Sequence, residues 1–149
     1  MPTIKLTIPR KVIAEIRQGA KAAFPKEWWA LLLGTNAGDH VQVDELYIPD
    51  DQDAYTSDYV IYEQTHWFAE AEAQARESEL LVVGRIHSHP FTQIEAQGCI
   101  WDRSQSEGDI DSQRHIVSGI CVVQQLKNKR LRTSIRFWGP TVRITAIIK

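Results

Sequence analysis

Two histidines separated by one residue are the clearest chemical signal in the sequence. His87 and His89 lie in the segment 84–90, Gly-Arg-Ile-His-Ser-His-Pro, which follows an apolar run. Side chains alternate along a β-strand, so both imidazoles point to one face, with Cβ atoms about 6–7 Å apart, and Ser88 points to the other. That spacing allows both rings to bind one zinc ion with Zn–N bonds near 2.0–2.1 Å. A pair alone is a weak signal, because short motifs arise by chance.

A metal site of this kind also requires a third ligand and a base. Ser106 and Asp109 form an S-x-x-D pattern that offers a carboxylate. The same pattern is typical of a helix N-terminus, with Ser106 as the cap and Asp109 reaching back. Glu27 stands directly before an apolar run and is the candidate base, and the alternative for it is an exposed loop carboxylate.

Strands and helices alternate around these residues. The turn sequence at 36–39 predicts a β-hairpin, and Pro90 is expected to end the strand that carries the histidines. Apolar spacing predicts helices at 10–23 and 62–77 and a helix start at 106, and strands at 4–8, 28–33, 41–48, 80–87, 117–123, 131–137 and 142–148. This order predicts an α/β fold, a mixed sheet flanked by helices, in a single domain over residues 1–149.

The composition is that of a globular protein, with 149 residues, 43% of them hydrophobic, and a formal net charge of −2. The longest apolar run, 28–33, is far shorter than the roughly 20 residues of a membrane-spanning helix, and the N-terminus lacks a signal-peptide pattern. The two cysteines, Cys99 and Cys121, are too few for a disulfide scaffold. We therefore expect a cytoplasmic protein with no membrane association.

Charge is unevenly distributed along the chain. Residues 27–75 contain eleven acidic and no basic residues, whereas residues 1–26 and 76–149 are net basic. The acidic block is either a surface for a basic partner or a solvated face. The basic residues near the C-terminus alternate along a predicted strand without a stacking platform, which disfavours a nucleic-acid partner.

Taken together, these segments resemble the JAMM (MPN-plus) metalloprotease family. The family motif is a distant glutamate, then H-x-H-P, then S-x-x-D, which Glu27, residues 87–90, Ser106 and Asp109 match in that order. The resemblance covers roughly residues 3–125, in a similar order of strands and helices. It implies a JAB/MPN-like fold of the cytidine-deaminase-like type.

The spacing of the motif departs from the family pattern. Sixteen residues separate His89 from Ser106, where family members usually have about seven or eight. Either this loop carries an insertion, or the third ligand is Asp102 or Asp111 instead of Asp109. We favour Asp109, because the helix expected after it matches the family context.

The resemblance implies zinc-dependent hydrolysis of an amide bond. One Zn²⁺ per chain would be held by His87, His89 and Asp109, leaving the fourth position to a water of lowered pKa. Glu27 would act as the general base, and Ser106 would help to stabilise the oxyanion.

Enzymes of this family generally cut the C-terminal tail of ubiquitin or a ubiquitin-like protein. The resemblance implies such a modifier or its conjugate as partner, with activating and conjugating enzymes alongside in a bacterial conjugation or defence system. The residues expected to bind it lie in the acidic segment and in loop 91–105, namely Asp50, Asp51, Asp53, Asp58, Phe91 and Trp101. Cys99, in that loop, would close the site if it were a fourth ligand. Two alternatives are a processing peptidase for a sulfur-carrier or ubiquitin-like precursor, and a non-catalytic scaffold.

Overall fold

The fold is built on a single large sheet. A computed structural model of the chain describes residues 3–50, 52, 66–91, 117–139 and 143–149. Its strands are β1 (Thr3–Ile8), β2 (Trp29–Asn36), β3 (His40–Tyr47), β4 (Leu81–Phe91), β5 (Val117–Gln125), β6 (Leu131–Trp138) and β7 (Arg143–Ile148), and its helices are α1 (Arg10–Ala23) and α2 (His66–Glu77). The strand order is β6-β5-β4-β2-β3-β1-β7, with parallel and antiparallel pairs in the same sheet. The predicted mixed α/β fold is therefore confirmed.

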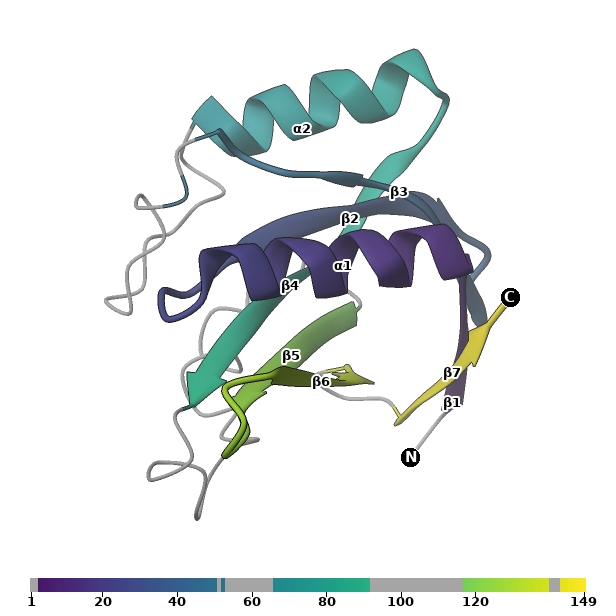
Figure 1. Ribbon diagram of the computed structural model, residues 1–149. Helices are drawn as coiled ribbons and strands as arrows, with labels where there is room; N and C mark the ends of the chain where they lie inside the picture. Colours follow the sequence, from purple (N-terminus) through teal and green to yellow (C-terminus); the bar gives the residue numbers. More distant parts are fainter. Residues whose placement is uncertain (1–2, 51, 53–65, 92–116, 140–142) are drawn as a thin grey trace.

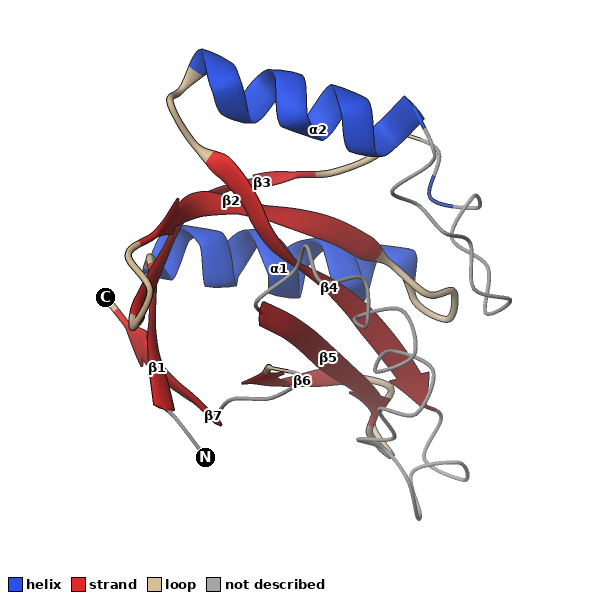
Figure 2. Cartoon of the chain, turned by 180° about the vertical axis from the view of Figure 1, so that it is seen from behind, coloured by secondary structure: helices blue, strands red, loops and turns tan. Residues whose placement is uncertain are grey.

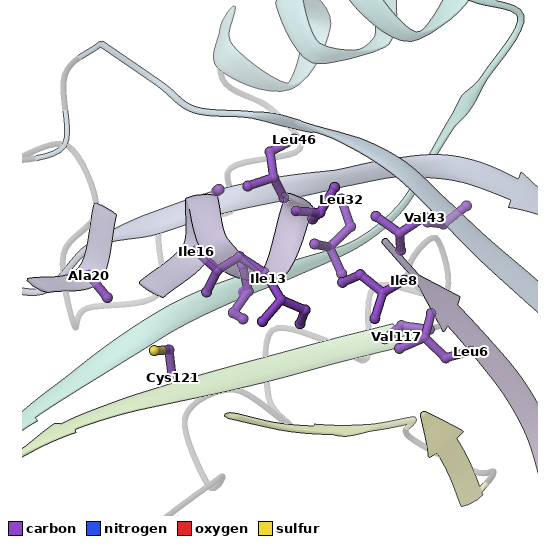
Figure 3. Close-up of a cluster of buried hydrophobic side chains, with 14 of the residues drawn as sticks. Leu6, Ile8, Ile13, Ile16, Ala20, Leu32, Val43, Leu46, Val117 and Cys121 are labelled. Carbon is purple, nitrogen blue, oxygen red and sulfur yellow. The ribbon is translucent and has the colours of Figure 1, made fainter. Parts of the chain in front are cut away.

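The two helices cover opposite faces of a strongly curled sheet (Figure 1). On α1, apolar residues at helical spacing form one buried stripe, which includes Val12, Ile16 and Ala20. Figure 3 shows this cluster, in which Ile16 and Ala20 of α1 lie near Cys121 of β5. On the other face, α2 buries Phe68, Ala71 and Ala75 against β2. Seen from behind, α2 is separated from α1 by the sheet (Figure 2).

Strand β2 lies at the centre of the sheet, between β3 and β4. Leu32 packs in the α1 cluster, whereas Trp29, Leu31 and Leu33 pack in the α2 cluster. A strand covered on both faces has a continuous apolar run rather than an alternating one, and residues 28–33 form such a run.

Strand β4 is longer than predicted, because Pro90 does not end it. The strand pairs in parallel with β5 through Pro90 and Phe91. On its other side, the pairing with β2 ends where the Ser88 N–H donates to the Trp28 carbonyl at 2.7 Å. Beyond Ser88, in the described part of the chain, β4 has a neighbour on one side only, which is the kind of edge position that tolerates proline. Phe91 is consequently a strand residue rather than a loop residue.

The other predicted elements agree with the structure to within a few residues at their ends. The hairpin turn contains Gly38, whose φ of 91° favours glycine. Trp28, Trp29 and Trp138 are buried in the core, whereas Trp67 is half-buried. The beginning of the helix predicted at 62–77 and the whole helix predicted from 106 lie outside the described residues. Neither α1 nor α2 is both long and apolar enough to cross a lipid bilayer.

Gly84 allows β4 to approach β5 closely. A Cβ atom at this position would lie 2.1 Å from the carbonyl oxygen of Val117, so the two backbones would have to separate. We expect Gly84→Ala to lower the free energy of unfolding by about 3 kcal/mol, measured by urea denaturation. The comparison is Gly38→Ala, which meets no atom within 4 Å and should cost about 1 kcal/mol through its positive φ alone. An equal loss in the two variants would contradict this packing argument.

Candidate active site

The two histidines of the motif lie together near the end of β4. His87 is opposite Trp29 in the β2–β4 register, and Trp29 packs in the α2 cluster, so the imidazoles face the α2 side of the sheet. The Nε2 atoms of His87 and His89 are 3.0 Å apart, and their ring centroids are 4.8 Å apart. The structure therefore brings the Nε2 atoms of the two histidines close together.

The two imidazoles differ in environment. His87 is 4% exposed, whereas His89 is half-buried. Burial lowers the pKa of His87 well below its ordinary value, and the neighbouring charges of His89 and Arg85 lower it further. His87 is therefore neutral at physiological pH, which is the form of imidazole that binds a metal ion.

The strand register places Glu27 beside the histidine pair. Trp28 forms backbone and side-chain hydrogen bonds with Ser88, so the preceding residue, Glu27, comes next to the end of β4. There its carboxyl and His89 are close enough for their charges to interact. Its side chain retains exposed surface at the rim of the site. Neighbouring protein atoms nevertheless remove enough water to raise the pKa of the Glu27 carboxyl, and the charge of His89 partly opposes that rise. A carboxylate with a raised pKa, next to a metal site, suits general-base catalysis.

Ser88 fixes the position of Glu27 from the opposite face of β4. Its Oγ accepts a hydrogen bond from the Trp28 N–H at 2.8 Å, and its own N–H donates to the Trp28 carbonyl at 2.7 Å. Both groups are buried. The serine between the two histidines thus holds the start of β2, and with it the candidate base, in register with the candidate ligands.

We expect Ser88→Ala to lower both stability and activity. The buried Trp28 N–H would lose its acceptor, which costs about 1–3 kcal/mol in the free energy of unfolding. Thermal denaturation measures this loss, and turnover should fall with zinc content unchanged, because neither histidine is altered. Ser134→Ala, on the exposed side of β6, is the matched control and should change neither property. Unchanged stability of Ser88→Ala would refute the role of this hydrogen bond.

Gln52 is a positioning residue that sequence reasoning did not identify. Its side-chain amide accepts from the Trp29 N–H at 2.9 Å and donates to the Trp29 carbonyl at 3.1 Å and to the Pro49 carbonyl at 2.7 Å. On this side of β2, the pairing with β3 ends at Leu31 and Tyr47. The Gln52 side chain therefore bonds the Trp29 backbone groups in place of a strand. One amide in an acidic segment forms no recognisable motif, so only the structure could reveal it.

Among the residues expected to bind substrate, the structure describes Phe91 and Asp50. The ring of Phe91 meets that of His89 edge-on, with centroids 6.3 Å apart, and packs against the apolar cluster of Ile120, Val122 and Trp138. Asp50 is exposed. The other candidates lie outside the described residues, namely Ser106, Asp109, Asp102, Asp111, Asp51, Asp53, Asp58, Trp101 and Cys99.

The described part of the site is compatible with a zinc ion held by two histidines. Two nitrogens bound to one tetrahedral zinc at 2.0–2.1 Å lie about 3.3 Å apart, close to the 3.0 Å separation of the two Nε2 atoms. In the structure the two nitrogens are within hydrogen-bond distance of each other and the ring planes are inclined at 53°, so the rings would have to turn to direct both lone pairs at a shared ion. Within the described residues, no group of three histidine, cysteine or carboxylate side chains gathers at one point.

Comparisons with known proteins agree with this fold. The chain is similar over 97% of its length to a protein of Desulfitobacterium hafniense whose structure was determined in solution, with 19% identity, 92% coverage of that chain and a TM-score of 0.59. It is also similar, over 95% of its length, to a JAB1/MPN domain protein from Archaeoglobus fulgidus, with 19% identity, 97% coverage of that chain and a TM-score of 0.52. No curated protein matches the sequence. At these identities the structural similarity establishes the fold, which is of the JAB/MPN type.

Residues 9–94 match the family of prokaryotic homologues of the JAB domain. The match covers more than half of the chain, and it includes Glu27 and both histidines. The chain therefore belongs to this family.

Proposed function

We propose that the chain is a zinc-dependent peptidase that cleaves the amide bond at the C-terminal tail of a ubiquitin-like protein. The observation that supports this most directly is the convergence of the His87 and His89 Nε2 atoms, 3.0 Å apart, beside Glu27. Membership in the prokaryotic JAB family supports it independently.

In the proposed hydrolysis, different residues bind the metal ion, transfer the proton and stabilise the oxyanion. Zinc, when bound, lowers the pKa of a water molecule and polarises the scissile carbonyl. His87 and His89 hold the ion, with Asp109 as the proposed third ligand. Glu27 accepts a proton from the attacking water and returns it to the leaving amine. Ser106 donates a hydrogen bond to the oxygen that becomes negatively charged.

The third ligand can be identified by substitution. We expect Asp109→Asn to weaken zinc binding by about 10-fold to 100-fold, because a neutral amide replaces an anionic ligand. Asp102→Asn and Asp111→Asn are the matched controls and should leave the affinity unchanged. Competition against a chromogenic chelator measures all three. A larger effect at Asp102 or Asp111 would transfer the ligand role to that residue.

The substrate proposal rests on charge and on the surroundings of the histidines. Asp50 is exposed where the chain leaves β3, and Asp51, Asp53 and Asp58 follow it in sequence. We propose that these carboxylates face a basic surface of the modifier. Phe91, beside His89, and Trp101 are proposed to contact its extended tail. In this proposal the partner is a cytoplasmic ubiquitin-like protein or its conjugate, made by activating and conjugating enzymes.

The test uses zinc-loaded protein and two kinds of substrate for each of several ubiquitin-like modifiers. One is a linear fusion to a reporter, and the other is an isopeptide conjugate to a lysine side chain. We expect mass spectrometry to locate one cut, after the last residue of the modifier, and a chelator to abolish it. Cleavage of the isopeptide conjugate indicates deconjugation, and cleavage of the linear fusion alone indicates precursor processing. No cleavage of either by zinc-loaded protein would contradict the proposal and favour a scaffold.

A further inference from the structure

The curled sheet leaves a cavity on the side away from the histidines. Its two edge strands, β6 and β7, come round towards each other on the α1 side (Figure 1). Between α1, β6 and β7 lies a cavity of about 310 Å³. Since the histidines face α2, this cavity is on the opposite face of the sheet, and nothing in the proposed function uses it.

The cavity is lined mainly by apolar side chains that the fold leaves accessible. Ile144, Ala146 and Ile148 alternate along β7 and all three line it, together with Ile13 of α1. The side of a strand that faces a helix is normally buried, yet Ile148 is 49% exposed. Among the residues that the structure describes, the two sheet edges therefore leave a strip of apolar surface uncovered, and such a strip is a common feature of ligand-binding grooves.

Positive charge borders this apolar strip. Arg17, one turn after Ile13 on α1, lines the cavity, and its Nη1 donates to the Thr133 Oγ1 of β6 at 3.4 Å. This contact links α1 to β6 and uses one of the five N–H donors of the guanidinium. Arg136 also lines the cavity, and none of the lining residues is acidic. The sequences of α1, β6 and β7 together contain seven lysines and arginines and a single acidic residue, Glu15.

We propose that this cavity binds a small amphipathic carboxylate, a single unbranched aliphatic chain with one anionic end. The chain would pack on Ile13, Ile144 and Ile148, and the carboxylate would accept hydrogen bonds from Arg17, whose planar fork matches a carboxylate. The cavity volume is at the lower end of the roughly 300–1,000 Å³ of small-molecule sites. It therefore fits one chain of medium length rather than a lipid with two chains.

Calorimetric titration with decanoate, kept below its micelle concentration, tests the proposal. We expect saturable binding of one decanoate per chain. Decan-1-ol, which has the same chain without the charge, should bind at least about tenfold more weakly, because it lacks the charge-assisted hydrogen bonds. Decylamine should not bind. Equal affinities for decanoate and decan-1-ol, or no saturable binding of decanoate, would overturn the proposal.

Two variants locate the site. Arg17→Met keeps an aliphatic side chain but removes the charge, so it should weaken decanoate binding about tenfold. Ala146→Phe, at an exposed position, should fill the cavity and abolish binding. The control is Arg132→Met, because Arg132 donates to Gln124 and does not line the cavity. Undiminished binding in Ala146→Phe would refute the location. Binding only to anionic vesicles, or dimerisation in place of decanoate binding, would show that the groove has another occupant.

Discussion

Glu27→Gln should retain zinc and lose cleavage of the ubiquitin-like fusion by about 10²–10⁴-fold, the usual contribution of a general base. Glutamine has nearly the same shape but cannot accept the proton. Glu27 precedes the Trp28–Ser88 pairing and is not expected to bind the metal, so the fold and the zinc content should persist. Single-turnover kinetics and elemental analysis measure the two properties on the same preparation.

The matched control for this prediction is Glu15→Gln. Glu15 is an exposed carboxylate on α1, on the other side of the sheet from the histidines. The same change of charge there should leave turnover within about twofold of the unmodified protein. If Glu27→Gln cleaves as fast as the control variant, Glu27 is not the base.

His89→Ala should abolish zinc binding and cleavage together while leaving the protein folded. His89 is half-buried near the end of β4, so its removal leaves no closed cavity in the core. The equivalent change at His87, which is 4% exposed, would combine loss of a ligand with loss of packing. His89→Ala is therefore the cleaner of the two tests. Loss of a supporting residue around a metal site typically lowers metal affinity about 10–100-fold, so loss of a direct ligand should lower the zinc affinity by more than about 100-fold, which leaves no bound zinc at micromolar concentrations of metal.

The control for His89→Ala is His40→Ala. His40 is also half-buried, and its Nε2 lies 2.7 Å from Thr7 Oγ1, between β3 and β1 and away from the site. This variant should lose some stability and keep its zinc. Comparable zinc loss in both variants would indicate that the metal binds nonspecifically to histidine, and the proposed site would be wrong.

Much of the fold followed from local patterns in the sequence. The buried apolar residues of α1 recur at helical spacing along the whole helix. The six-residue apolar run at 28–33, which continues into β2, is long enough to require cover on both faces. Asn36 and Gly38 favour a hairpin turn, because the Asn36 side chain accepts a hydrogen bond from the Gly38 N–H. In each case the signal depends on neighbouring residues alone.

The features that sequence reasoning missed depend on residues distant in the chain. Pro90 can continue β4 because β2 begins at Trp29, some sixty residues earlier in the chain, and so does not pair with β4 at Pro90. The sequence around Pro90 does not show where β2 begins. Gln52 replaces a missing strand neighbour of Trp29 with its side-chain amide, an arrangement without a sequence pattern. In the candidate site, alternation along a strand predicted that His87 and His89 would converge. The placement of Glu27 near His89 depends on the hydrogen bonds between Trp28 and Ser88, which form only in the folded sheet.

X-ray absorption at the zinc edge, on protein purified without chelator, shows directly whether His87 and His89 hold a zinc ion. We expect about one zinc per chain, with two imidazole nitrogens near 2.0–2.1 Å and the remaining ligands oxygen. His89→Ala should remove this signal. A protein that takes up no zinc when the metal is added, or one that binds it through cysteine sulfur, would contradict a catalytic ion held by His87 and His89.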